Sequence, residues 1–436
     1  MGRRALAWAV VGVLLVAGCS EAEDGTSTAT TGGTGTDLPE GDTVLARYGG
    51  EDWFLGTLPD APTAADPDAE PIVIGIINQE DTPLGSYPEI RRAVEGGVAF
   101  VNEELGGIDG RPLELRTCIT SFNPEQSAGC AQEMEQADVV ALVGGLDVTS
   151  NGSIPVLEQN GIAQVGGIPA NLVEQQSDVT FFLSGGVTGA LAAFLAHTAE
   201  AGGERAVLAY GEFESFTVAA NDYAKPVAES LGMELETVSF QLTATDFLPV
   251  LTRAAESDPD AIIVAAAGAA CAPIMRTYRD LGIEAQLYLV GACADDEILL
   301  AADGAEEGVI FNSEGPPAGQ GDVEGGIFAS VNELYANDEA GGAGTVGLRS
   351  FFALYGVLSD LGADGISRAA ILESMRTSVD RPGFWGHSYT CDGKQVVGLP
   401  ALCAPQQSLI RVGDDGQIET INDEWYDTVA LFAGAQ

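Results

Sequence analysis

The chain contains seven cysteines, its most reactive side chains, and six of them fall into three close pairs along the sequence. Six cysteines allow fifteen pairings, but partners close in sequence are the simplest solution, so we predict three disulfides. Zinc binding is the alternative, although the spacings do not match a zinc-binding motif and only two histidines could assist. The predicted pairs are Cys118–Cys130, Cys271–Cys293 and Cys391–Cys403, and the histidines are His197 and His387.

The seventh cysteine, Cys19, ends a short N-terminal segment that is typical of an export signal. Arg3 and Arg4 supply positive charge, residues 5–16 are apolar but too few to span a bilayer, and small residues precede the cysteine. The segment resembles a bacterial lipoprotein signal, in which cleavage before Cys19 leaves its thiol joined to diacylglycerol. Two acyl chains hold a protein on a membrane. An ordinary secretory signal that happens to contain a cysteine is the alternative.

The mature chain, from Cys19 to Gln436, would be strongly acidic. Without Arg3 and Arg4 it carries 16 basic and 65 acidic residues, a net charge of −49. Because this charge repels phosphate backbones and anionic lipid, we expect no nucleic-acid partner and membrane contact through the lipid anchor only. Apolar residues make up 46% of the whole chain, and no later run reaches transmembrane length, so two soluble, tethered domains are expected outside the cytoplasmic membrane.

Residues 19–70 are predicted to form a flexible stalk, because Gly, Thr, Ala, Asp and Pro dominate and apolar periodicity is weak. The stretch from Tyr48 to Leu58 is an exception within this range. Trp53, Phe54 and Leu55 are too apolar for a free linker, which favours docking of this stretch on a folded body.

From Ile72 onward, apolar strand-like runs alternate with amphipathic helical stretches, and this rhythm predicts an α/β fold with two successive parallel sheets. The first series has strands near 72–77, 113–119, 139–143 and 162–165, with helices near 89–105, 124–136 and 154–159. The second has strands near 206–210, 235–240, 261–266 and 286–290, with helices near 189–201, 216–231, 247–256 and 273–281. Helical stretches near 327–335, 348–361 and 367–376 and a last strand near 409–412 follow.

Four segments carry a resemblance to a known family, and they occur in that family's order and spacing: Gly85–Leu115, Asn123–Gln126, Val143–Gly145 and Met275–Gly282. They resemble the leucine/isoleucine/valine-binding protein family, the type I substrate-binding proteins of ABC importers, and the likeness covers about residues 71–418. It implies two Rossmann-like lobes with parallel sheets, joined by three hinge strands, that capture a ligand in the cleft between them.

The resemblance also implies how the chain divides between the lobes. Lobe 1 would comprise residues 71–185 and 314–388, and lobe 2 residues 186–313 and 389–436. The chain would cross between them near 183–186, 311–315 and 386–391.

Candidate ligand-binding residues lie where ligands meet open parallel sheets, in the loops at the carboxyl ends of the strands. In lobe 1 these loops hold Asn78, Gln79, Glu80, Tyr87, Asp147, Thr149, Ser150, Asn151, Gly166 and Gly167. The resemblance implies that hydroxyls after the third strand receive an amino acid's carboxylate, a place held by Thr149 and Ser150. Another register puts the family's serine at Val148 or Asp147, and both hydroxyls could instead cap the next helix.

Lobe 2 departs from the family where its amino-acid binders carry a tyrosine and an acid for the ligand's amine. Here Ala267 and Ala270 stand at those places. A buried ammonium without a countercharge is costly, so an α-amino acid is expected only if Glu212, Asp295 or Asp296 takes over.

Glu212 and Phe213 follow a predicted strand, where the family places an aromatic wall, and an ordinary exposed turn is the alternative. The resulting ligand-site prediction comprises Gln79, Glu80, Tyr87, Thr149, Ser150, Gly167, Glu212, Phe213 and Asp295.

Three functions remain open at this point. The first is a monomeric solute-binding lipoprotein that delivers a small polar molecule, such as a branched-chain amino acid or an amide, to ABC permease subunits. The second is a ligand-sensing lipoprotein of the same fold that reports to a receptor or regulator. The third, an enzyme, is disfavoured because neither His197 nor His387 accompanies a nucleophile motif and no phosphate-binding glycine loop occurs. We therefore expect no catalysis, cofactor or metal.

Overall fold

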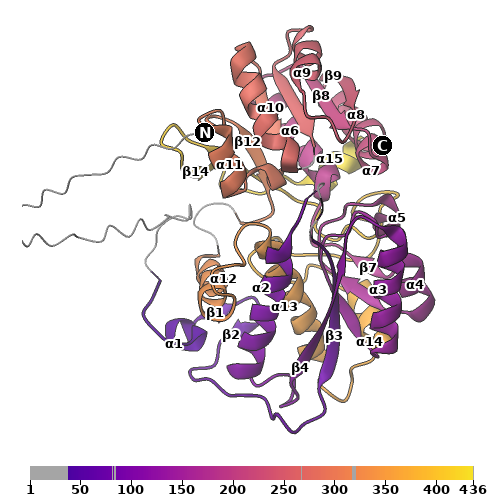
Figure 1. Cartoon of the computed structure of the whole chain (residues 1–436), viewed down its shortest axis with the longest axis vertical. Coiled ribbons are helices and arrows are strands. Elements are labelled where there is room, and N and C mark those ends of the chain that lie inside the picture. The colour runs from indigo at the N-terminus through magenta and orange to yellow at the C-terminus, as the bar shows by residue number, and fades with distance from the viewer. Residues whose placement is uncertain (1–37, 81, 83–84, 267, 317–320, 436) are drawn as a thin grey trace, which may run out of the picture.

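The computed structural model describes residues 38–435 except for 81, 83–84, 267 and 317–320, and it contains two lobes, each built around one sheet (Figure 1). The predicted signal peptide, Cys19, the first part of the predicted stalk and Ala267 lie outside the described residues. Among the described helices, none combines the length and apolar character needed to cross a membrane.

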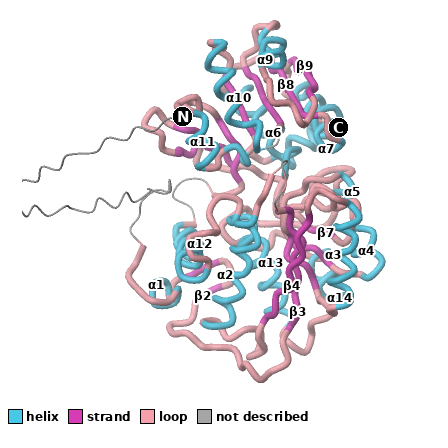
Figure 2. The backbone as a smooth tube through the Cα atoms, viewed as in Figure 1, coloured by secondary structure: helices cyan, strands magenta, loops and turns pink. Residues whose placement is uncertain are grey.

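Lobe 1 contains a five-stranded parallel sheet with strand order β4-β3-β5-β6-β7. Its strands are β3 (Ile72–Gln79), β4 (Leu113–Thr120), β5 (Ala141–Gly144), β6 (Ala163–Val165) and β7 (Thr180–Phe181). Helices α2 (Pro88–Glu103) and α13 (Gly344–Leu361) lie on one side of the sheet, and α3 (Pro124–Gln136) and α4 (Ile154–Asn160) lie on the other (Figure 2). Covering on both faces explains why the interior strand β3 is a nearly continuous apolar run. Three further helices belong to this lobe: α5 (Leu172–Gln175), α12 (Asp322–Tyr335) and α14 (Arg368–Arg376).

Lobe 2 contains a seven-stranded sheet with strand order β14-β13-β12-β11-β10-β8-β9. The strands from β8 to β12 are parallel, and the last two are antiparallel. They are β8 (Arg205–Gly211), β9 (Glu234–Phe240), β10 (Ala261–Ala265), β11 (Gln286–Leu289), β12 (Ile310–Ser313), β13 (Ser408–Val412) and β14 (Ile418–Thr420). The helices are α6 (Gly186–Glu200), α7 (Glu214–Val218), the π-helical η1 (Ala219–Ala224), α8 (Lys225–Ser230), α9 (Leu248–Ala255), α10 (Gly268–Leu281), the 3-10 turn η2 (Gly291–Cys293), α11 (Asp296–Ala302) and α15 (Thr428–Gly434). The predicted α/β fold with two parallel-sheet lobes is confirmed.

Three segments of the chain cross between the lobes. The first connects β7 to α6, and the second leaves β12 after Ser313. The third crossing was predicted at residues 386–391 but extends further along the chain. Residues 389–404, which come before β13, contribute side chains to both hydrophobic cores. The first and third crossings lie side by side, since the Cys403 amide donates to the Phe182 carbonyl oxygen at 2.8 Å.

All three predicted disulfides are present: Cys118–Cys130, Cys271–Cys293 and Cys391–Cys403. The second of them ties the first turn of α10 to η2, which follow the neighbouring strands β10 and β11. These bonds use six cysteines, and the described residues contain no cluster of His, Cys, Asp or Glu that could hold a metal ion. The disulfide interpretation therefore replaces the zinc alternative.

Residues 44–58 form an arm that packs on lobe 1. It consists of α1 (Val44–Tyr48) and a hairpin of β1 (Asp52–Trp53) and β2 (Gly56–Thr57). The buried Glu104 carboxylate accepts hydrogen bonds from the first two amides of α1, at 2.8 and 2.7 Å. Trp53 packs edge-on against Phe352, with ring centres 5.3 Å apart. The apolar stretch therefore docks as its composition suggested, and residues 44–58 are not part of a flexible stalk.

We predict that Glu104→Ala detaches the arm. The substitution leaves two amides at the start of α1 and the hydroxyl of Tyr335, which donates to Glu104 at 2.6 Å, without their acceptor. The free energy of unfolding should fall by about 1–3 kcal/mol, and amide exchange in residues 44–58 should accelerate more than in β3. Urea unfolding and hydrogen-exchange mass spectrometry measure both effects. The neighbouring exposed Glu103→Ala is the control, and equal behaviour of the two variants would contradict the assignment.

Candidate functional site

The carboxyl ends of the two parallel sheets face each other at the junction between the lobes. The last strand of the first sheet, β7, runs directly into the first crossing, and β12 of the second sheet runs into the second crossing. Because the neighbouring strands are parallel to these two, their carboxyl ends lie on the same edges. The loops after β3, β5 and β6 are thus directed toward the loops after β8, β10 and β11 (Figure 1).

The two sets of loops touch in this structure. The Ser215 hydroxyl, beyond β8 in lobe 2, donates to the Ala170 carbonyl oxygen, beyond β6 in lobe 1, at 2.8 Å. Asp295, just before α11, places its Oδ2 atom only 3.4 Å from the point where a Cβ atom on Gly342 of lobe 1 would lie. The lobes are therefore closed upon each other along this edge.

The end of β3 and the residue that follows it are two buried candidates, Gln79 and Glu80, that differ in their partners. Glu80 accepts two hydrogen bonds from the guanidinium of Arg91, at 2.8 and 3.1 Å, so its charge is already compensated within lobe 1. The side-chain amide of Gln79 donates to the Gly85 carbonyl oxygen at 3.1 Å, whereas its Oε1 atom is buried without a hydrogen-bond partner among the described residues. Gln79 is consequently the candidate with free hydrogen-bonding capacity here.

The loop after β5 is organised by the buried carboxylate of Asp147. It accepts hydrogen bonds from the hydroxyls of Thr149 at 2.7 Å and Ser127 at 2.5 Å, so the Thr149 hydroxyl is used inside the loop. The Ser150 hydroxyl is buried and makes no hydrogen bond of ordinary length to the described residues. Neither hydroxyl caps α4, because Ser153 precedes that helix.

Glu174 of α5 is an acidic neighbour of Ser150. Burial raises the pKa of Glu174 to about 8, while two backbone amides and the Ser150 hydroxyl act in the opposite direction. The shortest contacts of that carboxylate are to the amides of Ala170 and Asn171, at 2.6 and 2.8 Å. Of the two predicted hydroxyls in the loop after β5, Ser150 therefore carries the one that could turn to a ligand.

The loop after β6 is bonded to a helix of its own lobe, α13. The Gly167 amide donates to the Ser350 hydroxyl of α13 at 2.8 Å. Gly166 has a φ of +77°, and a Cβ atom there would lie 2.1 Å from the same hydroxyl oxygen. Glycine is required for this close approach, and the Gly167 amide predicted to bind ligand already has a partner.

In lobe 2, Glu212 and Phe213 lie between β8 and α7. Glu212 is exposed and accepts hydrogen bonds from Ser239, at 3.1 Å, and from Gln241. Phe213 is half-buried and packs edge-on against Phe216, with ring centres 5.9 Å apart. Glu212 thus has the surroundings of an exposed turn, whereas Phe213 offers part of an aromatic surface.

An acidic group that sequence reasoning missed, Glu89, lies beside the junction. Burial and the charge of Asp295 in the other lobe raise the pKa of Glu89 to about 7. Burial, Glu89 and Asp295 also raise the pKa of Tyr87, which immediately precedes α2. Asp295 caps α11 with Oδ1, which accepts the Glu297 amide at 2.9 Å, while Oδ2 approaches lobe 1. The sequence did indicate Glu89 in one way, because it lies in the first turn of a predicted helix that follows the end of a strand.

The family model of periplasmic binding proteins matches residues 71–397, which include both sheets up to the third crossing. The chain belongs to the periplasmic binding protein family. This confirms the resemblance inferred from the sequence and places the protein among proteins that act outside the cytoplasm.

Solved structures share the fold of this periplasmic binding protein at low sequence identity. The leucine-binding protein LivK of Thermotoga maritima is 20% identical, with a TM-score of 0.67 over 80% of this chain and 98% of that chain. LivJ of Streptococcus pneumoniae, solved with isoleucine, is 16% identical, with a TM-score of 0.66 over 81% and 99%. A solute-binding protein of R. palustris, solved with 4-hydroxybenzoate, is 16% identical, with a TM-score of 0.65 over 82% and 97%. No curated protein sequence matched the chain.

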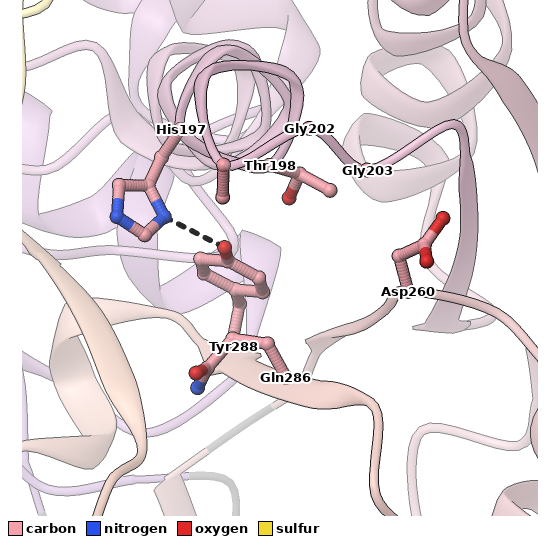
Figure 3. Close-up of a pocket in the computed structure, with 8 residues that line it drawn as sticks. His197, Thr198, Gly202, Gly203, Asp260, Gln286 and Tyr288 are labelled. Atoms are coloured by element: carbon pink, nitrogen blue, oxygen red, sulfur yellow. Dashed lines mark hydrogen bonds between the residues drawn. The ribbon is translucent and has the colours of Figure 1, made fainter.

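A separate pocket lies at the amino ends of β10 and β11, on the opposite edge of the second sheet from the junction (Figure 3). His197 contacts the Tyr288 hydroxyl through Nδ1 at 2.7 Å. Burial lowers the pKa of His197. The hydroxyl of Thr198 donates to the Phe194 carbonyl oxygen at 2.8 Å. His197 therefore has a structural partner, and the lining supplies no activated nucleophile beside it. His387 contacts the carbonyl oxygen of Ser388 through Nδ1 at 2.6 Å.

We predict that Glu89→Gln alters how stability depends on pH. Because the folded-state pKa of Glu89 is about 7 and its ordinary value is 4.5, the unfolded chain releases this proton first as the pH rises. The stability associated with protonated Glu89 is fully present below the ordinary value and is lost as the pH rises toward 7. Urea unfolding at pH 5 and pH 8 should show a larger loss for the wild type than for the variant. Glu125→Gln, exposed in the first turn of α3, is the control, and an equal loss in wild type and Glu89→Gln would contradict the assignment.

Proposed function

We propose that the protein is the solute-binding lipoprotein of an ABC importer and captures a small polar molecule between its lobes without changing it chemically. The observation that supports this most directly is the pair of buried polar atoms Gln79 Oε1 and Ser150 Oγ, which lack ordinary hydrogen-bond partners among the described residues. Gln79 ends β3 and Ser150 lies in the loop after β5, both at the sheet edge that is directed toward lobe 2. Buried polar atoms are normally paired, so a ligand that completes their hydrogen bonds accounts for them.

The charges beside the junction favour a ligand that carries an ammonium group. Glu89 and Asp295 come from different lobes, and burial together with the charge of Asp295 raises the pKa of Glu89, an effect that a cation between the two carboxylates would offset. They replace the tyrosine and acid whose expected places are Ala267 and Ala270. With Ser150 available to donate to a carboxylate, a branched-chain amino acid, an amide or a related compound fits this set of groups.

The same proposal extends to the envelope and to partner proteins. Residues 1–18 are removed as a signal peptide, Cys19 carries the lipid, and a stalk leads to the arm that begins at Val44. The body divides into lobe 1, residues 71–185 and 314–388, and lobe 2, residues 186–313 and 405–436, with residues 389–404 crossing between them because they contribute to both cores. A monomer of this form presents its ligand to the permease subunits of the importer.

We predict that Ser150→Ala weakens binding, because one hydrogen bond to the ligand is lost. Isothermal titration against a panel of amino acids, short-chain amides, urea and aromatic acids identifies a ligand first. The variant should then lose about 0.5–1.5 kcal/mol of binding free energy, up to about tenfold in Kd. Ser121→Ala, at an exposed serine after β4, should bind as the wild type does. Unchanged affinity in Ser150→Ala, or turnover of any panel compound, would contradict the proposal.

We further predict that the double variant Glu89→Gln, Asp295→Asn distinguishes charged ligands from neutral ones. Removing both carboxylates should weaken the binding of an amino acid by about tenfold or more, but affect the matching uncharged amide much less. The comparison is made by titration at pH 8, where Glu89 is ionised in the wild type. Glu297→Gln, exposed at the start of α11, is the control. A loss of the same size for both ligands would show that the two carboxylates do not recognise charge.

A further inference from the structure

Glu314 lies at the point where all three crossings meet. It follows β12 at the start of the second crossing, and its side chain is only 15% exposed. Its Oε1 atom accepts a short hydrogen bond from the hydroxyl of Ser184 in the first crossing. The same atom lies 3.4 Å from the side-chain nitrogen of Gln407, which precedes β13 in the third crossing. One carboxylate therefore connects the three segments that join the lobes.

The third partner of Glu314 belongs to lobe 1. The guanidinium of Arg349, on α13, lies 3.5 Å from Oε2 of Glu314, and its side chain is 6% exposed. Burial lowers the pKa of Arg349, while Glu314 and Glu324 act in the opposite direction. Arg349 also donates to the Trp385 carbonyl oxygen at 3.1 Å. Because a buried charge needs a partner, Glu314 is held to lobe 1 as well as to the crossings.

The contacts continue from the hinge into a loop at the junction. Gln407 accepts a hydrogen bond from the side-chain amide of Asn312 at 2.7 Å, and the oxygen of the same amide accepts the Gly291 amide at 2.7 Å. Gly291 begins η2, whose last residue, Cys293, is bonded to Cys271. The hinge is thus connected by side chains to the loop that carries Asp295.

We propose that Glu314 is a positioning residue that holds the lobes in the closed arrangement seen here and thereby slows their opening. When one lobe rotates against the other, the backbone dihedral angles change in the crossings. A side chain of the second crossing that is bonded to the other two crossings and to Arg349 must lose or lengthen some of these bonds during that rotation, so opening requires free energy. This inference rests on the two-lobe fold and not on the identity of the ligand.

Hydrogen exchange in the ligand-free, full-length protein tests the proposal. Glu314→Gln removes the charge that pairs with Arg349, and Ser184→Ala removes one crossing from the cluster without leaving a buried charge unpaired. In both variants, the amides of the crossings should exchange hydrogen about tenfold faster than in the wild type. These amides belong to residues 180–186 and 401–408, and the same is expected for the junction loop, residues 146–153. The amides of the core strands β3 and β8 should exchange at the wild-type rate. A general loss of stability would instead accelerate exchange in these strands as well.

The control is Glu333→Gln, which removes a partly exposed carboxylate of α12 that pairs with Arg47 of the arm at 2.7 Å. It should leave the crossings and the junction loop unchanged. The proposal would be overturned if the amides of the crossings exchanged at the wild-type rate in Ser184→Ala. It would also be overturned if exchange accelerated equally throughout both hydrophobic cores. If Glu314→Gln does not fold, Ser184→Ala decides the outcome alone. Because no ligand is used, a negative result would leave the proposed solute-binding function in place.

Discussion

The structure depends on one topological constraint, which is that the chain leaves both parallel sheets for the other lobe at the carboxyl ends of strands. β7 leads into the first crossing and β12 into the second, so the strand ends of one sheet must be directed toward those of the other. Loops at strand ends carry free backbone groups and polar side chains. The same constraint thus brings Ser150 and Gln79 of lobe 1 to the edge that Asp295 approaches from lobe 2.

Bonds within each lobe make that lobe rigid, so rotation of one lobe against the other has to occur at the crossings. In lobe 1, the arm is fixed by Glu104 and by the packing of Trp53 on Phe352. In lobe 2, the Cys271–Cys293 disulfide joins the first turn of α10 to η2, beyond the carboxyl ends of β10 and β11. Such internal bonds make each lobe move as a unit, which is what hinge closure around a ligand requires. Glu314 then lies where the motion has to be absorbed.

The sequence predicted those features that depend on neighbours in the chain. Apolar runs identified β3, β8 and β10, and the close pairs of cysteines predicted the disulfides correctly. The orientation of side chains within and near a loop was beyond its reach, as for Thr149, which turns to Asp147, and Glu80, which pairs with Arg91. Partners distant in sequence were also beyond its reach, as for Gly167, whose amide donates to Ser350 of α13. Glu89 was missed for the same reason, because its electrostatic environment includes Asp295 of the other lobe.

The central claim, that a small molecule is bound between the two sets of strand ends, is tested most directly by a crystal structure of the protein with a compound that it binds. The account predicts density for the unaltered compound at the junction, within hydrogen-bonding distance of Ser150 and close to Glu89 and Asp295. Density outside the junction, such as in the pocket beside His197, or a chemically altered compound, would contradict it.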